Sequence, residues 1–94
     1  MVSKRGDYYA LKVKGDSMIE DGIWDSDTVI IRHQQIANDK DTVVAVTEDG
    51  ATLKRFRNKN GKIYLEPRNK NLGNIYPMQL EIRGVFCGLI RDKT

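Results

Sequence analysis

Short strand-like runs, each ended by a turn signal, are the feature that most limits what this chain can fold into. No segment of about eleven or more residues carries the 3.6-residue period of a helix. The runs are rich in β-branched residues, which pack well on a pleated sheet. We expect one helical turn after Ser17, and strands over residues 8–13, 28–32, 42–47, 51–57, 62–66, 80–83 and 85–91.

Turn signals predict how these strands are joined. Asn60-Gly61 is a strong two-residue hairpin signal, and Glu48-Asp49-Gly50 is typical of a second tight turn. The sequence therefore predicts an all-β fold: a small curled, partly barrel-like sheet of short, mostly antiparallel strands with hairpins. We assign residues 8–94 to a single domain. Residues 1–7 are short and polar, and we expect them to be flexible.

The size and composition of the chain predict a small core. A domain of 94 residues lies near the lower end for a self-sufficient core. The hydrophobic share of 39% is below the globular average, and the charged share of 31% is above it. Burial against a partner subunit is therefore a plausible source of additional stability.

The net charge of +3 raises the question of nucleic-acid binding. Phe56 lies within a basic stretch. Proteins that bind single-stranded nucleic acid combine aromatic side chains with positive charge in this way. Acidic residues, however, are interspersed along most of the chain, whereas a nucleic-acid interface concentrates positive charge. We therefore rank direct nucleic-acid binding third, below a function as an enzyme and below a function in binding other proteins. The basic stretch consists of Lys54, Arg55, Arg57, Lys59 and Lys62.

Several other classes of protein lack the residues they need here. No run of 18 apolar residues and no signal peptide occur, so we expect no membrane contact. Cys87 is the only cysteine, which excludes an internal disulfide and suits a reducing cytoplasm. A calcium loop starting at Asp25 would need glycine and glutamate where Ile30 and Ile36 stand. No residue pattern suits zinc or a phosphate, so we expect neither metal nor cofactor.

Ser17 is a candidate nucleophile in the turn Gly15-Asp16-Ser17-Met18. Its structural alternative is a capping box, with Ser17 at the N-cap and Glu20 three residues later. The two roles are compatible, because a serine that opens a helical turn lies beside unpaired backbone N–H groups. Such N–H groups are what an oxyanion hole requires. We therefore assign the oxyanion and substrate pocket to Asp16, Ser17 and Met18.

Lys54 is the candidate general base. Strand periodicity places Lys54 on the same face as Thr52 and Phe56. Most strand lysines are solvated or protect a sheet edge. If this face is buried, however, desolvation lowers the pKa of Lys54, and the neutral amine can accept the proton of a serine. A triad would instead depend on His33, the only histidine, which is more simply a solvated loop residue.

The closing segment is the candidate dimer interface. Within residues 80–91, Val85, Cys87 and Leu89 alternate with Phe86, Gly88 and Ile90, so both faces are largely apolar, and a domain this small has little to cover the second face. Gly84 and Gly88 leave room for another backbone. We expect a symmetric homodimer in which this strand pairs with its own copy, the alternative being a central strand covered within one subunit. The interface residues would be Val85, Phe86, Cys87 and Leu89.

These motifs together resemble the self-cleaving domain of LexA-type repressors, which also occurs in UmuD proteins and some phage repressors. The similarity covers approximately residues 8–91, in the order and at the separations of the family. It begins with Val13-Lys14-Gly15-Asp16-Ser17-Met18-Ile19 and continues through Gly22-Ile23, Asp25-Ser26-Asp27 and Val29-Ile30-Ile31. It continues through Val43-Val44-Ala45-Val46, Thr52-Leu53-Lys54-Arg55-Phe56, Leu65-Glu66-Pro67-Arg68-Asn69 and the residues from Gly84 to Arg91.

The resemblance implies an autoproteolytic serine peptidase with Ser17 as nucleophile and Lys54 as general base. Family members act in the SOS response to DNA damage as cytoplasmic transcription repressors. They cut an Ala-Gly or similar bond in their own upstream linker when the RecA–DNA filament stimulates them. The domain also dimerises, and DNA is bound by a separate N-terminal helix-turn-helix domain.

The chain departs from the family pattern in its turns and at its N-terminal end. Ser26 stands where the family commonly has glycine, and Asp39-Lys40-Asp41 lacks another usual glycine. No Ala-Gly dipeptide and no helix-turn-helix segment occur. We therefore expect a processed product, a shortened chain or a free-standing relative. The alternative function is a UmuD-like or phage-repressor-derived module for dimerisation and partner binding, in which the Ser-Lys pair is spent or vestigial.

Overall fold

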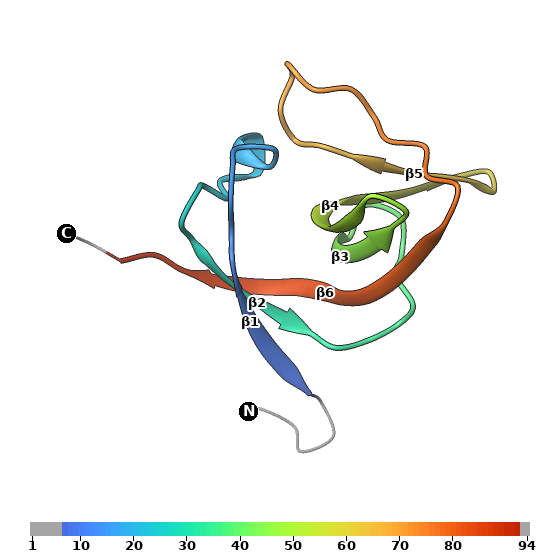
Figure 1. Ribbon diagram of the computed structural model, residues 1–94. Helices are drawn as coiled ribbons and strands as arrows, with labels where there is room; N and C mark the ends of the chain where they lie inside the picture. The colour runs from blue at the N-terminus through green and yellow to red at the C-terminus, as the bar shows by residue number, and fades with distance from the viewer. Residues whose placement is uncertain (1–6, 93–94) are drawn as a thin grey trace.

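Six antiparallel strands form a single curled sheet in the computed structural model, which describes residues 7–92 (Figure 1). The predicted all-β fold is confirmed, although the sheet does not close into a barrel. Most of the expected flexible segment, residues 1–7, lies outside the described residues. Within residues 7–92, no helix has the length and apolar character needed to cross a membrane. The elements are β1 (Tyr8–Lys12), η1 (Ile19–Asp21), β2 (Thr28–Arg32), β3 (Thr42–Thr47), β4 (Gly50–Lys59), β5 (Lys62–Glu66) and β6 (Leu80–Ile90).

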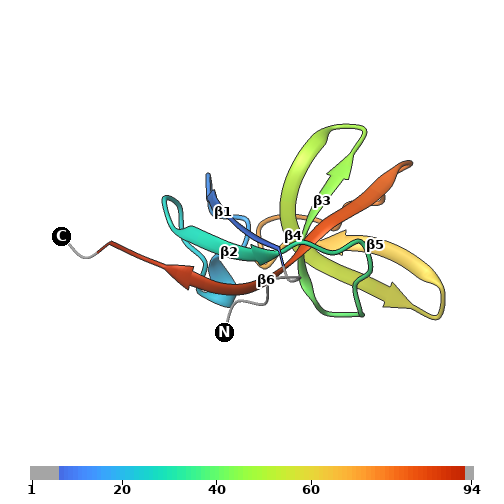
Figure 2. The same cartoon turned by 90° about the horizontal axis from the view of Figure 1, so that it is seen from below.

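Strand β6 joins the two halves of the sheet. The strand order is β1-β2-β6-β3-β4-β5, and β6 pairs with β3 through residues 80–85 but with β2 through residues 85–90. Figure 2 shows β1 and β2 on one side of the bend and β3, β4 and β5 on the other. The two separate runs expected around Gly84 are therefore one continuous strand.

Gly84 lies where β6 passes from one partner strand to the other. A Cβ at this position would meet Ile31, the Arg32 carbonyl and the Tyr9 hydroxyl. The space that we expected Gly84 to leave for a second subunit is thus taken by β1 and β2 of the same chain. Gly88, in contrast, has no atom near the position of a Cβ and remains open.

Two hydrophobic clusters, one on each face of β3, hold the sheet together. The first core contains Met18, Ile23, Val29, Ile31 and Val44, with Leu53, Phe86 and Leu89 packed against it. The second core contains Val43, Ala45, Phe56, Leu65 and Ile82, with Val85 packed against it. Neighbouring residues of β3 therefore enter different cores, as expected for side chains that alternate between the faces of a strand.

The turns follow the local sequence in most places. Asn60 and Gly61 join β4 to β5 with φ angles of 54° and 86°, as a two-residue hairpin requires. The helical turn after Ser17 is present as η1, but its N-cap is Met18 and no side chain caps it. The capping-box interpretation of Ser17 is therefore wrong. Glu20 instead accepts a hydrogen bond from the backbone N–H of Lys70, at 2.6 Å.

Candidate active site

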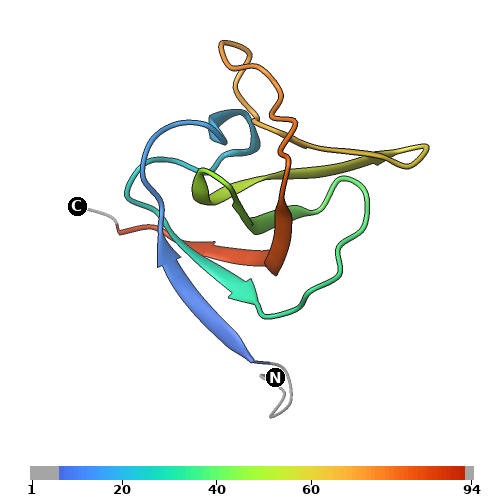
Figure 3. The same ribbon diagram turned by 45° about the vertical axis from the view of Figure 1, so that its right-hand side comes forward.

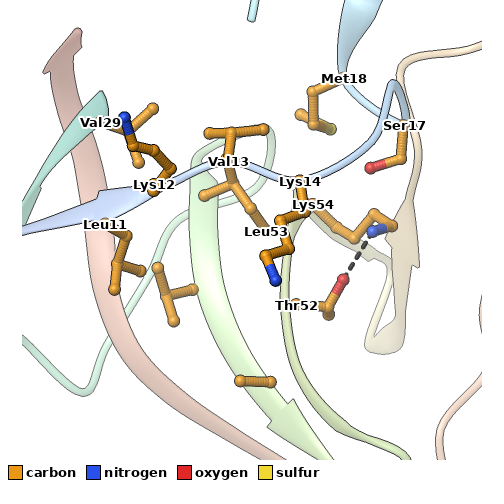
Figure 4. Close-up of a pocket in the computed structure, with 12 residues that line it drawn as sticks. Leu11, Lys12, Val13, Lys14, Ser17, Met18, Val29, Thr52, Leu53 and Lys54 are labelled. Carbon is orange, nitrogen blue, oxygen red and sulfur yellow. Dashed lines mark hydrogen bonds between the residues drawn. The ribbon is translucent and has the colours of Figure 1, made fainter. Parts of the chain in front are cut away.

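A cavity of about 310 Å³ lies where the first core meets β4. Figure 4 shows its walls, which come from β1 and the chain after it, the turn that contains Ser17, and the first half of β4. Most of the lining is apolar, and the polar groups include both predicted catalytic side chains. The lining residues are Leu11, Lys12, Val13, Lys14, Ser17, Met18, Val29, Val44, Ala51, Thr52, Leu53 and Lys54.

The residues 15–22, which we name the nucleophile turn, present Ser17 to this cavity. The turn starts at Gly15, whose φ of 89° few other residues adopt, and whose N–H donates to Asp25 Oδ1 at 2.7 Å. Met18 anchors the turn to the first core, where the side chain is buried and only 1% of the residue's surface is exposed. The Ser17 hydroxyl has no hydrogen-bond partner within residues 7–92. It therefore has no capping task, and it is half-buried at the cavity wall.

Lys54 reaches the same cavity from β4. Its side chain is half-buried, and its Nζ donates a hydrogen bond to Thr52 Oγ1 at 2.5 Å. Burial lowers the pKa of Lys54 below its ordinary value of 10.5. No carboxylate among the described residues pairs with it to restore the charged form. The expected desolvation of this lysine is therefore present in the structure.

Figure 4 shows the Ser17 hydroxyl and the Lys54 amine on the same side of the cavity, with the end of the Lys54 side chain turned toward Thr52. In this structure the hydrogen bond of the amine goes to Thr52. A direct Ser17–Lys54 hydrogen bond of roughly 2.6–3.2 Å stays a prediction, because catalytic hydrogen bonds often tighten only when substrate binds.

Unpaired backbone donors lie next to Ser17. Within the described part of the chain, the N–H groups of Asp16, Ser17 and Met18 have no acceptor, whereas the N–H of Ile19 donates to the Asp16 carbonyl at 3.2 Å. The sequence assigned the same three residues to an oxyanion pocket. An N–H group without an internal acceptor is free to stabilise negative charge on a substrate oxygen.

Two contacts at the site were not predicted from the sequence. The sequence placed Thr52 on the same face as Lys54, but its role as a hydrogen-bond acceptor was not predicted. The spacing of two residues along a strand, which brings the side chains side by side, was the signal that could have indicated it. Asp21, at the end of η1, forms ion pairs with Arg55 at 3.3 Å and with Arg68 at 3.0 Å. No local pattern signals that pairing, because its partners come from distant strands and loops.

Both arginines of the basic stretch, Arg55 and Arg57, form ion pairs of this kind, whereas its three lysines form none among the described residues. Arg57 contacts Asp39 and Glu66, each at 3.0 Å, in addition to the pairing of Arg55 with Asp21. A surface whose arginines are already paired is a poor counterion for phosphate. His33, which directly follows β2, is exposed and does not line the cavity.

Asp27 secures the loop behind the nucleophile turn. It is 2% exposed and accepts hydrogen bonds from Arg91 Nε at 2.7 Å and from the backbone N–H of Trp24 at 2.7 Å. The hydrogen bond from Arg91 lowers the pKa of Asp27 to about 2. The guanidinium of Arg91 also lies 3.7 Å from the centre of the Trp24 ring. The end of β6 is thus tied to the segment that follows Ser17.

The predicted dimer residues are mostly engaged within the chain. Phe86 and Leu89 pack against the first core and Val85 packs against the second, and all three are half-buried. Cys87 alone among the four is exposed. The role of these residues in association stays a prediction.

The family described as peptidase S24-like matches residues 1–87. The chain belongs to this family. Membership in the peptidase S24-like family makes it a domain of serine peptidase type, and the residues on the cavity wall suit that chemistry.

Named relatives of this S24-like domain are LexA repressors. The LexA repressor of Cereibacter sphaeroides is 52% identical over 95 residues, which is 98% of this chain and 42% of the relative. That of Clostridium perfringens is 47% identical over 90 residues, 96% of this chain and 44% of the relative. That of Pelotomaculum thermopropionicum is 45% identical over 86 residues, which is 92% of this chain and 42% of the relative. The resemblance to LexA-type repressors is confirmed, and the chain spans less than half the length of these relatives.

Proposed function

We propose that this chain is the self-cleavage and dimerisation domain of a LexA-type transcription repressor, with Ser17 as nucleophile and Lys54 as general base. The observation that carries the proposal is the presence of both side chains in the lining of one cavity, with the lysine desolvated. The relatives named LexA repressor support the same assignment.

The chemistry follows from a neutral lysine. The Lys54 amine takes the proton of the Ser17 hydroxyl while Oγ attacks a peptide carbonyl, and the carbonyl oxygen becomes an anion beside the free N–H groups of the nucleophile turn. Collapse of this intermediate breaks the C–N bond. The protonated Lys54 then gives its proton to the leaving amine. A water molecule, deprotonated by the same amine, hydrolyses the acyl-serine ester and restores the enzyme.

The edge of β4 supports an extended peptide as substrate. Residues 50–55 of β4 pair with β3, whereas β5 pairs only from Arg55 onward, so residues 50–54 have one edge without a strand partner among the described residues. That edge ends at Lys54. A peptide added there as a strand would satisfy these backbone groups and place a carbonyl near Ser17. The apolar cavity lining favours small apolar side chains on it.

The free edge of β6 supports dimerisation in the same way. Residues 86–90 pair with β2 on one side and have no strand partner on the other within residues 7–92. Ile90 is 58% exposed beside this edge, and Cys87 is also exposed. Pairing of two copies along this edge would bury both side chains and complete the backbone hydrogen bonds.

The regulatory partners of the proposed repressor follow from the family. The RecA–DNA filament would stimulate cleavage, and DNA would be bound by a separate helix-turn-helix domain of the longer protein. Dimerisation through β6 would present two such domains to a symmetric operator. Cleavage of the linker would separate them from this domain and release the promoter. A protein with these roles would act in the cytoplasm, in the response to DNA damage.

The test is cleavage of a fluorogenic decapeptide that contains one Ala-Gly bond. We expect the wild-type chain to cleave it at alkaline pH, and Ser17→Ala and Lys54→Ala each to abolish cleavage while the melting temperature shows an intact fold. Unchanged cleavage in Lys54→Ala would assign the base elsewhere. A wild-type chain that dimerises without cleaving would instead support the UmuD-like partner-binding alternative.

A further inference from the structure

A second segment of the chain lies against the nucleophile turn. Residues 67–71, which we name the clamp segment, follow β5 and run beside η1, as Figure 3 shows. The Arg68 N–H donates to the Ser17 carbonyl at 2.7 Å, and the Glu20 N–H donates to the Arg68 carbonyl at 2.8 Å. The two segments are therefore joined by reciprocal backbone hydrogen bonds, as two paired strands would be.

Asn69 is the buried polar residue of this contact, with 9% of its surface exposed. Its Nδ2 donates to the Asp16 carbonyl at 3.0 Å, and its Oδ1 accepts from the N–H of Asn71 at 2.9 Å. One partner is an acceptor and the other a donor, so the orientation of the amide is fixed by both. A buried amide held in this way positions whatever it binds.

The group that Asn69 binds belongs to the catalytic backbone. In a trans peptide unit the C=O and the following N–H point in opposite directions, and no cis peptide bond occurs in the described residues. The Asp16 carbonyl shares its peptide unit with the Ser17 N–H. The Ser17 carbonyl, held by Arg68, shares its unit with the Met18 N–H. Both carbonyls are thus held from the clamp side, while both N–H groups lack an acceptor within residues 7–92.

A hydrogen bond to a carbonyl also strengthens its peptide unit as a donor. Accepting a bond polarises the amide, so the N–H at the other end of the unit becomes a better donor. The Asp16 carbonyl also accepts from the Ile19 N–H, but that bond is longer, at 3.2 Å. The side-chain amide of Asn69 therefore supplies the shorter of the two bonds that orient the Ser17 N–H.

We propose that Asn69 is a positioning residue for catalysis, which holds the Asp16–Ser17 peptide unit so that the Ser17 N–H faces the substrate oxyanion. This rests on the proposed function, because it assigns a task within the same cleavage reaction. Among the described residues, Asn69 forms no hydrogen bond with Lys54 or with the Ser17 hydroxyl, so its action is on the stabilisation of negative charge and not on the base.

The test compares two variants in the cleavage of the same Ala-Gly decapeptide. Asn69→Asp has the shape of the native side chain and still accepts from Asn71, but it cannot donate to Asp16 once ionised. Asn69→Ala removes both bonds. Asn74→Ala, an exposed amide of the following loop, is the control. Rates are measured well below the melting temperature of each variant, with kcat and KM determined separately across pH.

We expect kcat to fall by roughly 10–100-fold in both Asn69 variants with little change in KM, since removal of a whole oxyanion donor costs about 10²–10³-fold. The pH midpoint of Asn69→Ala should match the wild type, because Lys54 is untouched. Asn74→Ala should behave as the wild type. A wild-type kcat in Asn69→Asp, or Asn69 variants that fail to fold, would overturn the positioning role. A wild-type chain without activity would overturn the proposed function itself.

Discussion

The amine of Lys54 donates a hydrogen bond to Thr52 Oγ1, two residues earlier on the same face of β4, at 2.5 Å. This contact orients the lysine toward the cavity that also contains Ser17. An acceptor favours the charged ammonium, whereas burial disfavours it, and burial is the effect that lowers the pKa of Lys54. The cleavage rate should therefore rise with pH through this lowered pKa and level off above it.

Thr52→Val should test the orienting contact directly. The hydroxyl is lost while the side-chain shape is kept, so Lys54 loses its acceptor and its pKa should fall further. We expect the pH–rate profile to shift to lower pH. The plateau should drop about tenfold, part of the roughly 10²–10⁴-fold that a positioned base contributes. Steady-state cleavage from neutral to alkaline pH measures both changes. A profile that moves to higher pH would contradict the assigned contact.

Lys54→Met should stabilise the fold while abolishing cleavage. Because burial lowers its pKa, the folded state binds the Lys54 proton less tightly than the unfolded state does. Wild-type stability consequently rises as pH rises through the window between the lowered pKa and 10.5. Below that window the full cost of burying the charge is present. We expect a melting temperature a few degrees higher for Lys54→Met at pH 7, and a smaller difference at alkaline pH.

Lys59→Met is the matched control for that measurement, because Lys59 lies on the same strand with an exposed side chain. Its melting temperature should stay close to that of the wild type at both pH values. An equal gain in both variants would attribute the effect to a lower net charge instead of to burial.

Lys40→Gly should also stabilise the protein. Lys40 has a φ of 78°, a left-handed conformation that costs a residue with a Cβ roughly 1–2 kcal/mol and costs glycine little. We expect a gain of about 1 kcal/mol, which raises the melting temperature of a domain of this size by roughly 4–8 °C. Lys62→Gly, in β5, should destabilise instead. A loss of stability in Lys40→Gly would show that the Lys40 side chain has an unassigned contact.

Ile90→Glu should weaken the proposed dimer. Ile90 is 58% exposed beside the free edge of β6, whereas Phe86 packs against the first core, where a charge would disturb folding. We expect wild-type chains at micromolar concentration to sediment at about twice the monomer mass. The dissociation constant of the dimer should be more than about tenfold higher in the variant than in the wild type, because burial of an unpaired carboxylate is unfavourable. Ile63→Glu, 45% exposed on β5, should remain dimeric. A monomeric wild type would remove the dimer from the proposal.

Local sequence was sufficient to predict most strands. Periodicity and turn residues gave the bounds of β2, β3 and β5 as found, because those runs are short, β-branched and ended by turn residues. The departures from family glycines were informative too, since Ser26 and Lys40 both adopt positive φ, of 75° and 78°. Two residues with a Cβ thus stand at positions whose backbone conformation best suits glycine.

Long-range pairing could not be predicted in the same way. Nothing local to β6 shows that it passes from β3 to β2 at its midpoint, since that choice depends on how both cores close. The contact of Asn69 with Asp16 has the same character, because it joins residues far apart in the chain. The capping box failed because Ser17 lies one residue before the N-cap of η1, where its hydroxyl is left without the expected partner.

The course of β6 also has a consequence for synthesis on the ribosome. The β3–β4–β5 meander pairs neighbours in sequence and can form early, whereas β2 gains its second partner only when residues 85–90 emerge. Phe86 and Leu89 then complete the core that supports Met18, beside Ser17. We therefore expect a nascent chain to lack a formed cavity until nearly all of the domain has been translated, and under the proposed function this delay would keep an upstream linker from being cut during synthesis.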